Sequence, residues 1–321
     1  MSPPIGISIG DPNGIGLETA LRAVQEPGDQ ELKGNVLLIG DRDLIRRGAE
    51  MLGVPCPEVL DPGVSYPEPH YGEVSAKAGA ASAAWVEAGI DACVRGHLSA
   101  LVTAPIHKHA WNLAGIPFPG HTELLGEWCG TDRFGMMLMG KGLRVMLATR
   151  HIPLSEVAAT LSEADIRLAV ELLAAGLPWM GVPAPRIAVC GLNPHAGDQG
   201  TLGREEVEWI APLLDRLGEE GYPVSGPHPA DTIFHHAVRG EADAVVALYH
   251  DQGLAPLKLW AFDEGVNLTL GLPILRTSPD HGTAFGIAGK GKARPDSMRH
   301  AVQAALDLTR RPNPWMPQPS V

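Results

Sequence analysis

Three of the 13 histidines could bind a metal ion. His151, His195 and His250 each follow closely on a short apolar run of the chain. Neutral imidazole nitrogens are good ligands for Zn²⁺ and related divalent cations, and three protein ligands leave positions open for substrate oxygens, as in catalytic sites. The three do not form an HxH or HExxH motif. From residue types alone, a metal site and ordinary surface or core histidines are therefore equally good interpretations.

Five further side chains could hold an anionic ligand. Arg offers a planar fork that grips phosphate or carboxylate, and Lys offers a point charge. Each of the five, taken singly, is also an ordinary solvated or buried polar residue. They lie in otherwise apolar or Gly/Pro-containing segments of a chain whose net charge is −12: His121, Thr122, Lys258, Asn267 and Arg276.

Two glycine-rich segments could approach a ligand closely, because glycine lets the backbone do so. Residues 280–291 could hold phosphate oxygens on backbone amides, and His281 could contact an adenine ring. Residues 286–293 nearly spell a P-loop, but Ala293 stands where a Ser or Thr must reach magnesium, which disfavours a nucleotide triphosphatase. Residues 10–16 lack the GxGxxG spacing, so a tight strand-to-helix turn and a ligand loop both stay open.

The elements that must position these residues alternate between strand and helix. Helical patterns cover residues 76–94, 155–175, 205–217 and 298–308, and a Pro/Gly-rich surface connection is expected at 55–69. Such alternation predicts an α/β fold with a largely parallel sheet, in two intimately packed lobes without a clean linker. The predicted buried strands are residues 5–9, 35–39, 100–103, 143–147, 186–190 and 244–249.

Most of the candidate residues come just after a predicted strand. Loops beyond the carboxyl ends of parallel strands are where α/β proteins place their sites. This position favours function for the loops that begin at residues 10, 103, 149, 191 and 250.

Composition narrows the class of protein. Hydrophobic residues make up 45% and charged residues 19%, a globular balance, and the negative charge argues against a nucleic-acid partner. The four cysteines form no CxxC pair, and no apolar run approaches the length of a membrane helix. We expect reduced, mostly structural thiols, a cytoplasmic location and no membrane partner. The proline-rich tail, residues 312–319, is expected not to be helical.

The chain resembles the 4-hydroxythreonine-4-phosphate dehydrogenase family of vitamin B6 biosynthesis. The segment HGTA to IAGKG is also similar to the adenosine-binding loop of isopropylmalate and isocitrate dehydrogenases, whose fold that family shares. The resemblance runs in order from about Ile7 to Ala293 on nine strings: GDPNGIG, TAPIHK, GIPFPGHTE, TRHIPL, GLNPHAG, GPHPADT, YHDQGL, VNLTLGLPILRTSPDHGTA and AGKGKA.

The resemblance implies a two-lobed fold of the isocitrate/isopropylmalate dehydrogenase type, distinct from the Rossmann fold. It implies a homodimer with sites at the subunit interface. His151, His195 and His250 would bind a divalent metal (Zn, or Mg or Co), with His250 coming from the partner chain. Gly286 is a departure, because relatives often carry an acidic residue there.

The resemblance also assigns the remaining roles. His121, Thr122, Lys258, Asn267 and Arg276 would bind substrate. Lys258, Asp231 and Asp251 are the candidate catalytic groups, although Asp251 could instead orient a histidine. NAD, with NADP as a possibility, would be held by His281, Gly282, Thr283, Ala284, Gly289 and Gly291.

The implied reaction is oxidation of 4-phosphohydroxy-L-threonine at C3 with NAD, followed by decarboxylation to 3-amino-2-oxopropyl phosphate. One alternative is the same chemistry on 4-phospho-D-threonate or 4-phospho-D-erythronate, which differ in the group at C2. A second alternative is a metabolite-binding protein without catalysis. NADH formation separates the enzyme from the binding protein, and a comparison of substrates separates the two enzymes.

Overall fold

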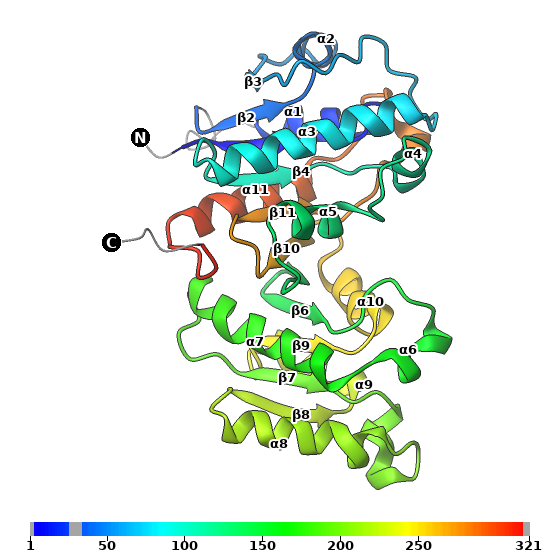
Figure 1. The fold of residues 1–321 in the computed structure, drawn as a ribbon, viewed down its shortest axis with the longest axis vertical. Helices are drawn as coiled ribbons and strands as arrows, with labels where there is room; N and C mark the ends of the chain where they lie inside the picture. Colours follow the sequence, from blue (N-terminus) through cyan, green and yellow to red (C-terminus); the bar gives the residue numbers. More distant parts are fainter. Residues whose placement is uncertain (1–2, 26–33, 317–321) are drawn as a thin grey trace. The chain divides into compact units, whose positions relative to one another are not determined.

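The chain folds into two compact α/β units. The computed structural model describes residues 3–25 and 34–316 (Figure 1). Unit 1 comprises residues 1–132 and 272–321, and unit 2 comprises residues 133–271. The chain therefore leaves unit 1 once and returns to it once. No described helix is long and apolar enough to cross a membrane.

Unit 1 is built on parallel strands in the order β3-β2-β1-β4-β11. Ile7 of the first strand pairs with Leu38 on one side and Val102 on the other. These side chains are fully buried, as expected for strands covered by helices on both faces. The strands are β1 (Ile5–Ser8), β2 (Val36–Ile39), β3 (Glu58–Leu60), β4 (Ala100–Thr103) and β11 (Arg276–Pro279).

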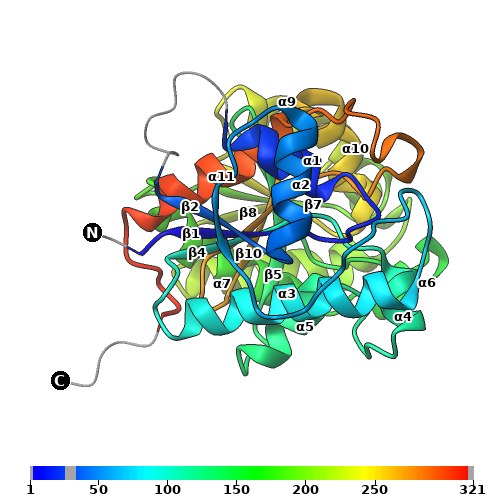
Figure 2. The same cartoon turned by 90° about the horizontal axis from the view of Figure 1, so that it is seen from above.

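Helices cover both faces of these strands. α1 contacts α2 and α11 on one face, and α3 packs with α4 and α5 on the other (Figure 2). Ser75 caps α3 by accepting a hydrogen bond from the Ala78 N–H. The helices are α1 (Gly16–Ala23), α2 (Arg42–Leu52), α3 (Ala76–Val94), α4 (Lys108–Leu113), α5 (His121–Trp128), the 3-10 turn η3 (Phe285–Ile287) and α11 (Asp296–Thr309).

Unit 2 has its strands in the order β10-β5-β6-β9-β7-β8. The pairs β10–β5 and β5–β6 are antiparallel, and β6, β9, β7 and β8 are parallel neighbours. Val245 pairs with Val145 and with Ala188, in the buried centre of this unit. The strands are β5 (Gly135–Gly140), β6 (Leu143–Leu147), β7 (Ile187–Cys190), β8 (Val224–His228), β9 (Ala244–Ala247) and β10 (Val266–Leu270).

The helices of unit 2 pack on these strands. α7 contacts β5, β6, β7, β9 and β10, and α10 contacts β5, β6 and β9. The short segment η1 is irregular and carries one of the candidate histidines. The helical segments are α6 (Leu154–Thr160), α7 (Glu163–Trp179), η1 (Pro194–Gly200), the π-helical turn η2 (Glu206–Ile210), α8 (Ala211–Glu219), α9 (Ala230–Val238) and α10 (His250–Ala261).

The structure confirms the α/β fold class and all six predicted strands. The helix predicted over 155–175 was wrong in its continuity, because Ser162 starts a new helix with a capping box to Asp165. The connection predicted at 55–69 was wrong in part, since it contains β3 and buries Tyr66. Residues 312–316 of the proline-rich tail are not helical, and residues 317–319 lie outside the described part.

The cysteines agree with the expectation of free thiols. All four are unpaired with one another, and Cys93 and Cys190 are buried. Burial raises the pKa of both thiols to about 12, so they stay protonated at neutral pH.

Candidate active site

The three candidate metal-binding histidines follow three neighbouring parallel strands of unit 2. His151 comes after β6, His250 after β9 and His195 after β7, and these strands are adjacent in the order β6-β9-β7. Gln252 joins two of the loops, accepting from the Leu248 N–H at 2.7 Å and donating to the Gly191 carbonyl at 2.8 Å. The carboxyl ends of these strands thus form one edge, as the sequence predicted.

Two of the three histidines lie side by side. The ring centroids of His151 and His250 are 5.3 Å apart, tilted by 41°. His250 Nδ1 is 2.7 Å from Asp251 Oδ1. A carboxylate at one imidazole nitrogen fixes the ring and directs the other nitrogen to a metal. Asp251 itself is 86% exposed, which favours its orienting role over a catalytic one.

His195 lies on an unusual left-handed turn. All five residues from His195 to Gln199 have positive φ, between 42° and 78°. Such conformations are unfavourable for residues other than glycine. The turn is held by the buried Glu206, whose carboxylate accepts from the Asn193 N–H at 2.7 Å and from Asn193 Nδ2 at 2.9 Å. Gly197 packs so closely on Glu206 that a Cβ there would meet its Oε2 at 2.6 Å.

The described part of the chain does not bring three metal ligands together. Within residues 3–25 and 34–316, no group of three or more His, Cys, Asp and Glu side chains is placed to hold a metal ion. Imidazole nitrogens such as those of His151 and His250 do suit a divalent cation of the zinc type. The metal-binding role of the three histidines stays a prediction.

A cluster in unit 1, which we call the anion-binding group after its expected ligand, consists of Thr103, Lys108, His121 and Arg276. Arg276 is 2% exposed, and its Nη2 and Nε donate to Thr103 Oγ1 at 2.6 and 3.1 Å. Lys108, at the start of α4, approaches Gly120, the residue before His121. Two cationic side chains therefore flank one imidazole. A cluster of this kind in an acidic protein suits a phosphate or carboxylate ligand.

Burial and the positive charges of this group lower the pKa of His121. Burial, followed by the positive charges of Arg276 and Lys108, lowers the pKa of His121 well below its usual range. The imidazole is therefore neutral at neutral pH. Its Nε2 is buried and makes no hydrogen bond to any described residue. Burial also lowers the pKa of Arg276 to about 10, opposed by Glu123, so the guanidinium stays charged at neutral pH.

The glycine-rich loop of residues 281–291 is fixed to the first loop of unit 1. The Ile15 N–H donates to the Thr283 carbonyl at 3.0 Å, and Arg22 donates to the Gly291 carbonyl at 2.8 Å. Ile15 is also buried with Ala288 and Ala293. The segment over residues 10–16, for which the sequence left two interpretations, thus supports the predicted cofactor loop.

Backbone conformation explains several glycines in this loop. Gly289 and Gly291 have φ of 70° and 63°, which favours glycine. At Gly286 an added Cβ would meet no atom within 4 Å. Packing therefore does not account for the missing acidic residue at that position.

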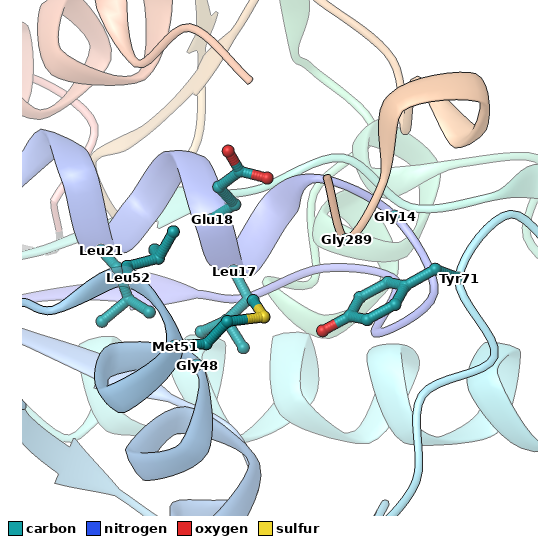
Figure 3. A pocket seen from close by; sticks show the side chains of 9 residues that line it. All are labelled: Gly14, Leu17, Glu18, Leu21, Gly48, Met51, Leu52, Tyr71 and Gly289. Atoms are coloured by element: carbon teal, nitrogen blue, oxygen red, sulfur yellow. The ribbon is translucent and has the colours of Figure 1, made fainter. Parts of the chain in front are cut away.

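A small pocket adjoins the loop in unit 1. Its walls come from α1 and α2, with Tyr71 and Gly289 at one end and Glu18 as the charged side chain (Figure 3). Glu18 accepts from the Ala293 N–H at 2.9 Å. No predicted catalytic residue lines this pocket. We therefore interpret its walls as residues that hold the glycine-rich loop in place.

The other candidate residues are placed on both units. Asn267 lies on β10, and its buried Oδ1 has no hydrogen-bond partner among the described residues. Lys258 lies on α10, with its Nζ 5.9 Å from the centroid of the Phe262 ring. Asp231 is exposed in the first turn of α9, which packs on η1. Thr122 is half-buried on α5, next to His121.

The sequence reasoning missed Thr103 and Lys108 as members of the anion-binding group. Both lie in or beside the string TAPIHK, and the loop after residue 103 was singled out by its position. Lys108 was missed because its proximity to His121 depends on the packing of α4 and α5 against α3.

The fold and these sites define a class of α/β enzymes that handle a small anionic ligand. The family model of the pyridoxal phosphate biosynthetic protein PdxA matches residues 32–305, and the chain belongs to this family. A 4-hydroxythreonine-4-phosphate dehydrogenase of Synechococcus sp. (strain JA-3-3Ab) is 43% identical over 95% of this chain and 94% of its own. The 4-hydroxythreonine-4-phosphate dehydrogenase of Chromobacterium violaceum is 44% identical, over 95% of this chain and 97% of that relative.

Solved structures agree with this membership. The crystal structure of 4-hydroxythreonine-4-phosphate dehydrogenase from Klebsiella pneumoniae is 37% identical and superposes with a TM-score of 0.87. The superposition covers 96% of this chain and 100% of the Klebsiella pneumoniae chain. The family resemblance predicted from the sequence is thus confirmed.

Proposed function

We propose that the protein oxidises 4-phosphohydroxy-L-threonine at C3 with NAD and releases the C1 carboxylate as CO₂. The hydride leaves C3 for the nicotinamide ring, and the resulting β-keto acid decarboxylates to 3-amino-2-oxopropyl phosphate. Membership of the PdxA family and the names of its relatives support this reaction. The observation that carries it is the anion-binding group.

The anion-binding group suits the substrate phosphate. Burying a guanidinium costs free energy unless other groups compensate, and the lowered pKa of Arg276 reflects that cost. A phosphate dianion bound there would compensate the charges of Arg276 and Lys108. Neutral His121 can donate or accept a hydrogen bond to the same ligand without adding a third charge.

Unit 2 carries the other residues to which the proposed reaction gives a role. The Asn267 amide would hold a polar substituent through its Oδ1, and Lys258 would bind an anionic group of the substrate or move a proton to it. Asp231 is the candidate for proton transfer from α9. Asp251 would keep the His250 ring in the orientation that a metal ligand needs.

A metal ion and a dinucleotide would supply the chemistry that the side chains cannot. A divalent cation would act as a Lewis acid and NAD as the hydride acceptor. The residues that would hold the cation are His151, His195 and His250. The residues that would hold the dinucleotide are His281, Gly282, Thr283, Ala284, Gly289 and Gly291.

A second copy of the chain would complete the site. Apolar side chains are exposed at the end of α10 and just after it, including Leu259 at 90% together with Trp260 and Phe262. Exposed apolar groups of this kind mark protein interfaces. His250 begins the same helix, so a homodimer contact along α10 would involve the element that carries one of the predicted metal ligands.

The test is NADH formation from 4-phosphohydroxy-L-threonine, followed by the absorbance of NADH, with and without a chelator. We expect turnover that the chelator abolishes and added Zn²⁺, Mg²⁺ or Co²⁺ restores. Faster turnover of 4-phospho-D-threonate or 4-phospho-D-erythronate would instead assign those substrates. Tight substrate binding without NADH would indicate a binding protein, and parallel assays with NADP would settle the cofactor preference.

A further inference from the structure

Asp11 and His107 are buried polar residues to which the proposed reaction assigns no role. Asp11 is 1% exposed, and its Oδ2 has no hydrogen-bond partner among the described residues. The Nδ1 of His107 is likewise buried and has none. Buried polar atoms without partners are unfavourable, so a native structure that keeps two of them near each other calls for a ligand or a water molecule.

The two residues lie at the carboxyl ends of neighbouring strands of unit 1. β1 and β4 are parallel neighbours. The loop after β1 leads to α1 on one face, and the loop after β4 leads to α4 on the other (Figure 2). Asp11 follows β1 and His107 follows β4, and the Asp11 N–H donates to the Pro105 carbonyl at 2.9 Å. Ligands of α/β sheets bind where neighbouring loops part in this way.

This place is next to both sites described above. The His107 ring stacks on Phe285 of the glycine-rich loop, with centroids 4.8 Å apart and planes at 22°. On the other side, Thr103 of the anion-binding group ends β4, four residues before His107. A group bound between the cofactor loop and the substrate is the nicotinamide, because hydride transfer requires its ring to meet the substrate.

The available atoms match one group of the nicotinamide half. Asp11 Oδ1 already accepts from the Asn13 N–H at 2.9 Å, which leaves Oδ2 as an acceptor. His107 Nδ1 can act as a donor. Burial raises the pKa of Asp11, and the Asn13 N–H and nearby His107 oppose that rise. A primary amide offers the complementary pair, an NH₂ donor beside a carbonyl acceptor.

We propose that Asp11 and His107 bind the carboxamide of the nicotinamide ring, an inference that rests on the proposed dehydrogenase function. The amide NH₂ donates to Asp11 Oδ2, and His107 Nδ1–H donates to the amide carbonyl. The two contacts fix the rotation of the ring about its ribose bond and so select the face that receives the hydride.

The test compares NAD with 3-acetylpyridine adenine dinucleotide, in which a methyl group replaces the NH₂. Dissociation constants are measured by titration calorimetry, without turnover. The wild type should bind NAD about tenfold more tightly than the analogue, as expected for one hydrogen bond to a charged group. Asp11→Asn keeps the acceptor for Asn13 but replaces Oδ2 by NH₂. It should bind NAD about tenfold more weakly and no longer discriminate against the analogue.

His107→Phe keeps the aromatic stack on Phe285 and removes both ring nitrogens, including Nδ1. It should weaken binding of both dinucleotides by a similar factor, because the analogue retains the carbonyl. The exposed Asp43 and His109 provide the matched controls Asp43→Asn and His109→Phe, which should bind both ligands like the wild type. Melting temperatures show that each variant is folded.

The outcomes separate this inference from the proposed function. A wild type that binds no dinucleotide overturns the dehydrogenase assignment and this inference with it. A wild type that binds NAD and the analogue equally overturns the carboxamide contact alone, whether or not Asp11→Asn folds. Unchanged discrimination in Asp11→Asn does the same, and the two buried atoms then hold a water molecule.

Discussion

At the scale of single residues, electrostatics decides which candidates can act. Arg276 and Lys108 lie close to His121, and their charges add to burial in keeping that imidazole neutral. The composition does not reveal this positive cluster, because the whole chain carries a net charge of −12. The local charge around the proposed substrate is thus opposite to that of the whole protein.

Arg276→Lys should weaken substrate binding. Lysine keeps the charge but not the planar fork, so we expect the KM for 4-phosphohydroxy-L-threonine to rise by about 10- to 100-fold, equivalent to about 1.5–3 kcal/mol for a charged hydrogen bond. NAD affinity, measured by calorimetry, should change little. The exposed Arg310→Lys is the control. An unchanged KM removes Arg276 from the substrate site.

His121 should make the protein sensitive to acid. Its lowered pKa means that below pH about 6.5 the unfolded chain binds a proton that the folded chain does not. Its contribution to stability is therefore present above that pH and lost as the pH falls. Urea unfolding at pH 7.5 and 5 should show a smaller loss for His121→Gln than for the wild type. The exposed His97→Gln should lose as much as the wild type, and equal losses in all three contradict the assignment.

At the scale of elements, turns and caps place the functional side chains. The left-handed turn that carries His195 is unfavourable in isolation and depends on Asn193 and Glu206. Glu206 begins a π-helical turn, a form found at functional sites. The sequence predicted a regular helix over 205–217 and did not foresee this contact.

Glu206→Gln should loosen the His195 turn. It replaces one of two accepting oxygens by a donor, in a side chain that is 3% exposed, so we expect a loss of about 1–3 kcal/mol in the free energy of unfolding. Zn²⁺ affinity, measured by competition with a chromophoric chelator, should fall as well. Glu208→Gln, at an exposed ion pair with Arg204, should change stability by less than about 1 kcal/mol. Unchanged Zn²⁺ affinity in Glu206→Gln would show that metal binding does not depend on the His195 turn.

At the scale of the whole molecule, the open question is which chains supply the three histidines. The described residues of one chain bring His151 and His250 together without completing a group of three. A shared site in a two-fold dimer would be completed by the partner. Mixed dimers of inactive variants distinguish the arrangements.

Mixing His151→Ala with His250→Ala chains should restore activity if His250 serves the partner's site. With random pairing about half the dimers are mixed, and each has one intact site of two, so recovery should approach about a quarter of wild type. Mixing His151→Ala with His195→Ala should restore nothing if both act in one chain. The reverse pattern assigns His195 to the partner, and no recovery in either mixture places all three in one chain. Turnover of 4-phosphohydroxy-L-threonine is the measurement.

The sequence alone predicted six of the strands, the loops that follow them and the family, but it did not predict β3, β5, β8, β10 and β11. Buried strands are short apolar runs, and helix starts such as Ser75 depend on contacts within a few residues, so local sequence is enough to predict them. The three histidines were predicted to lie after strands, and they do. Tertiary structure alone decided that Arg276 donates a hydrogen bond to Thr103, 173 residues away, that Lys108 lies near His121, and that Asp11 lies near His107. Such contacts depend on strand order and helix packing, which no local pattern encodes.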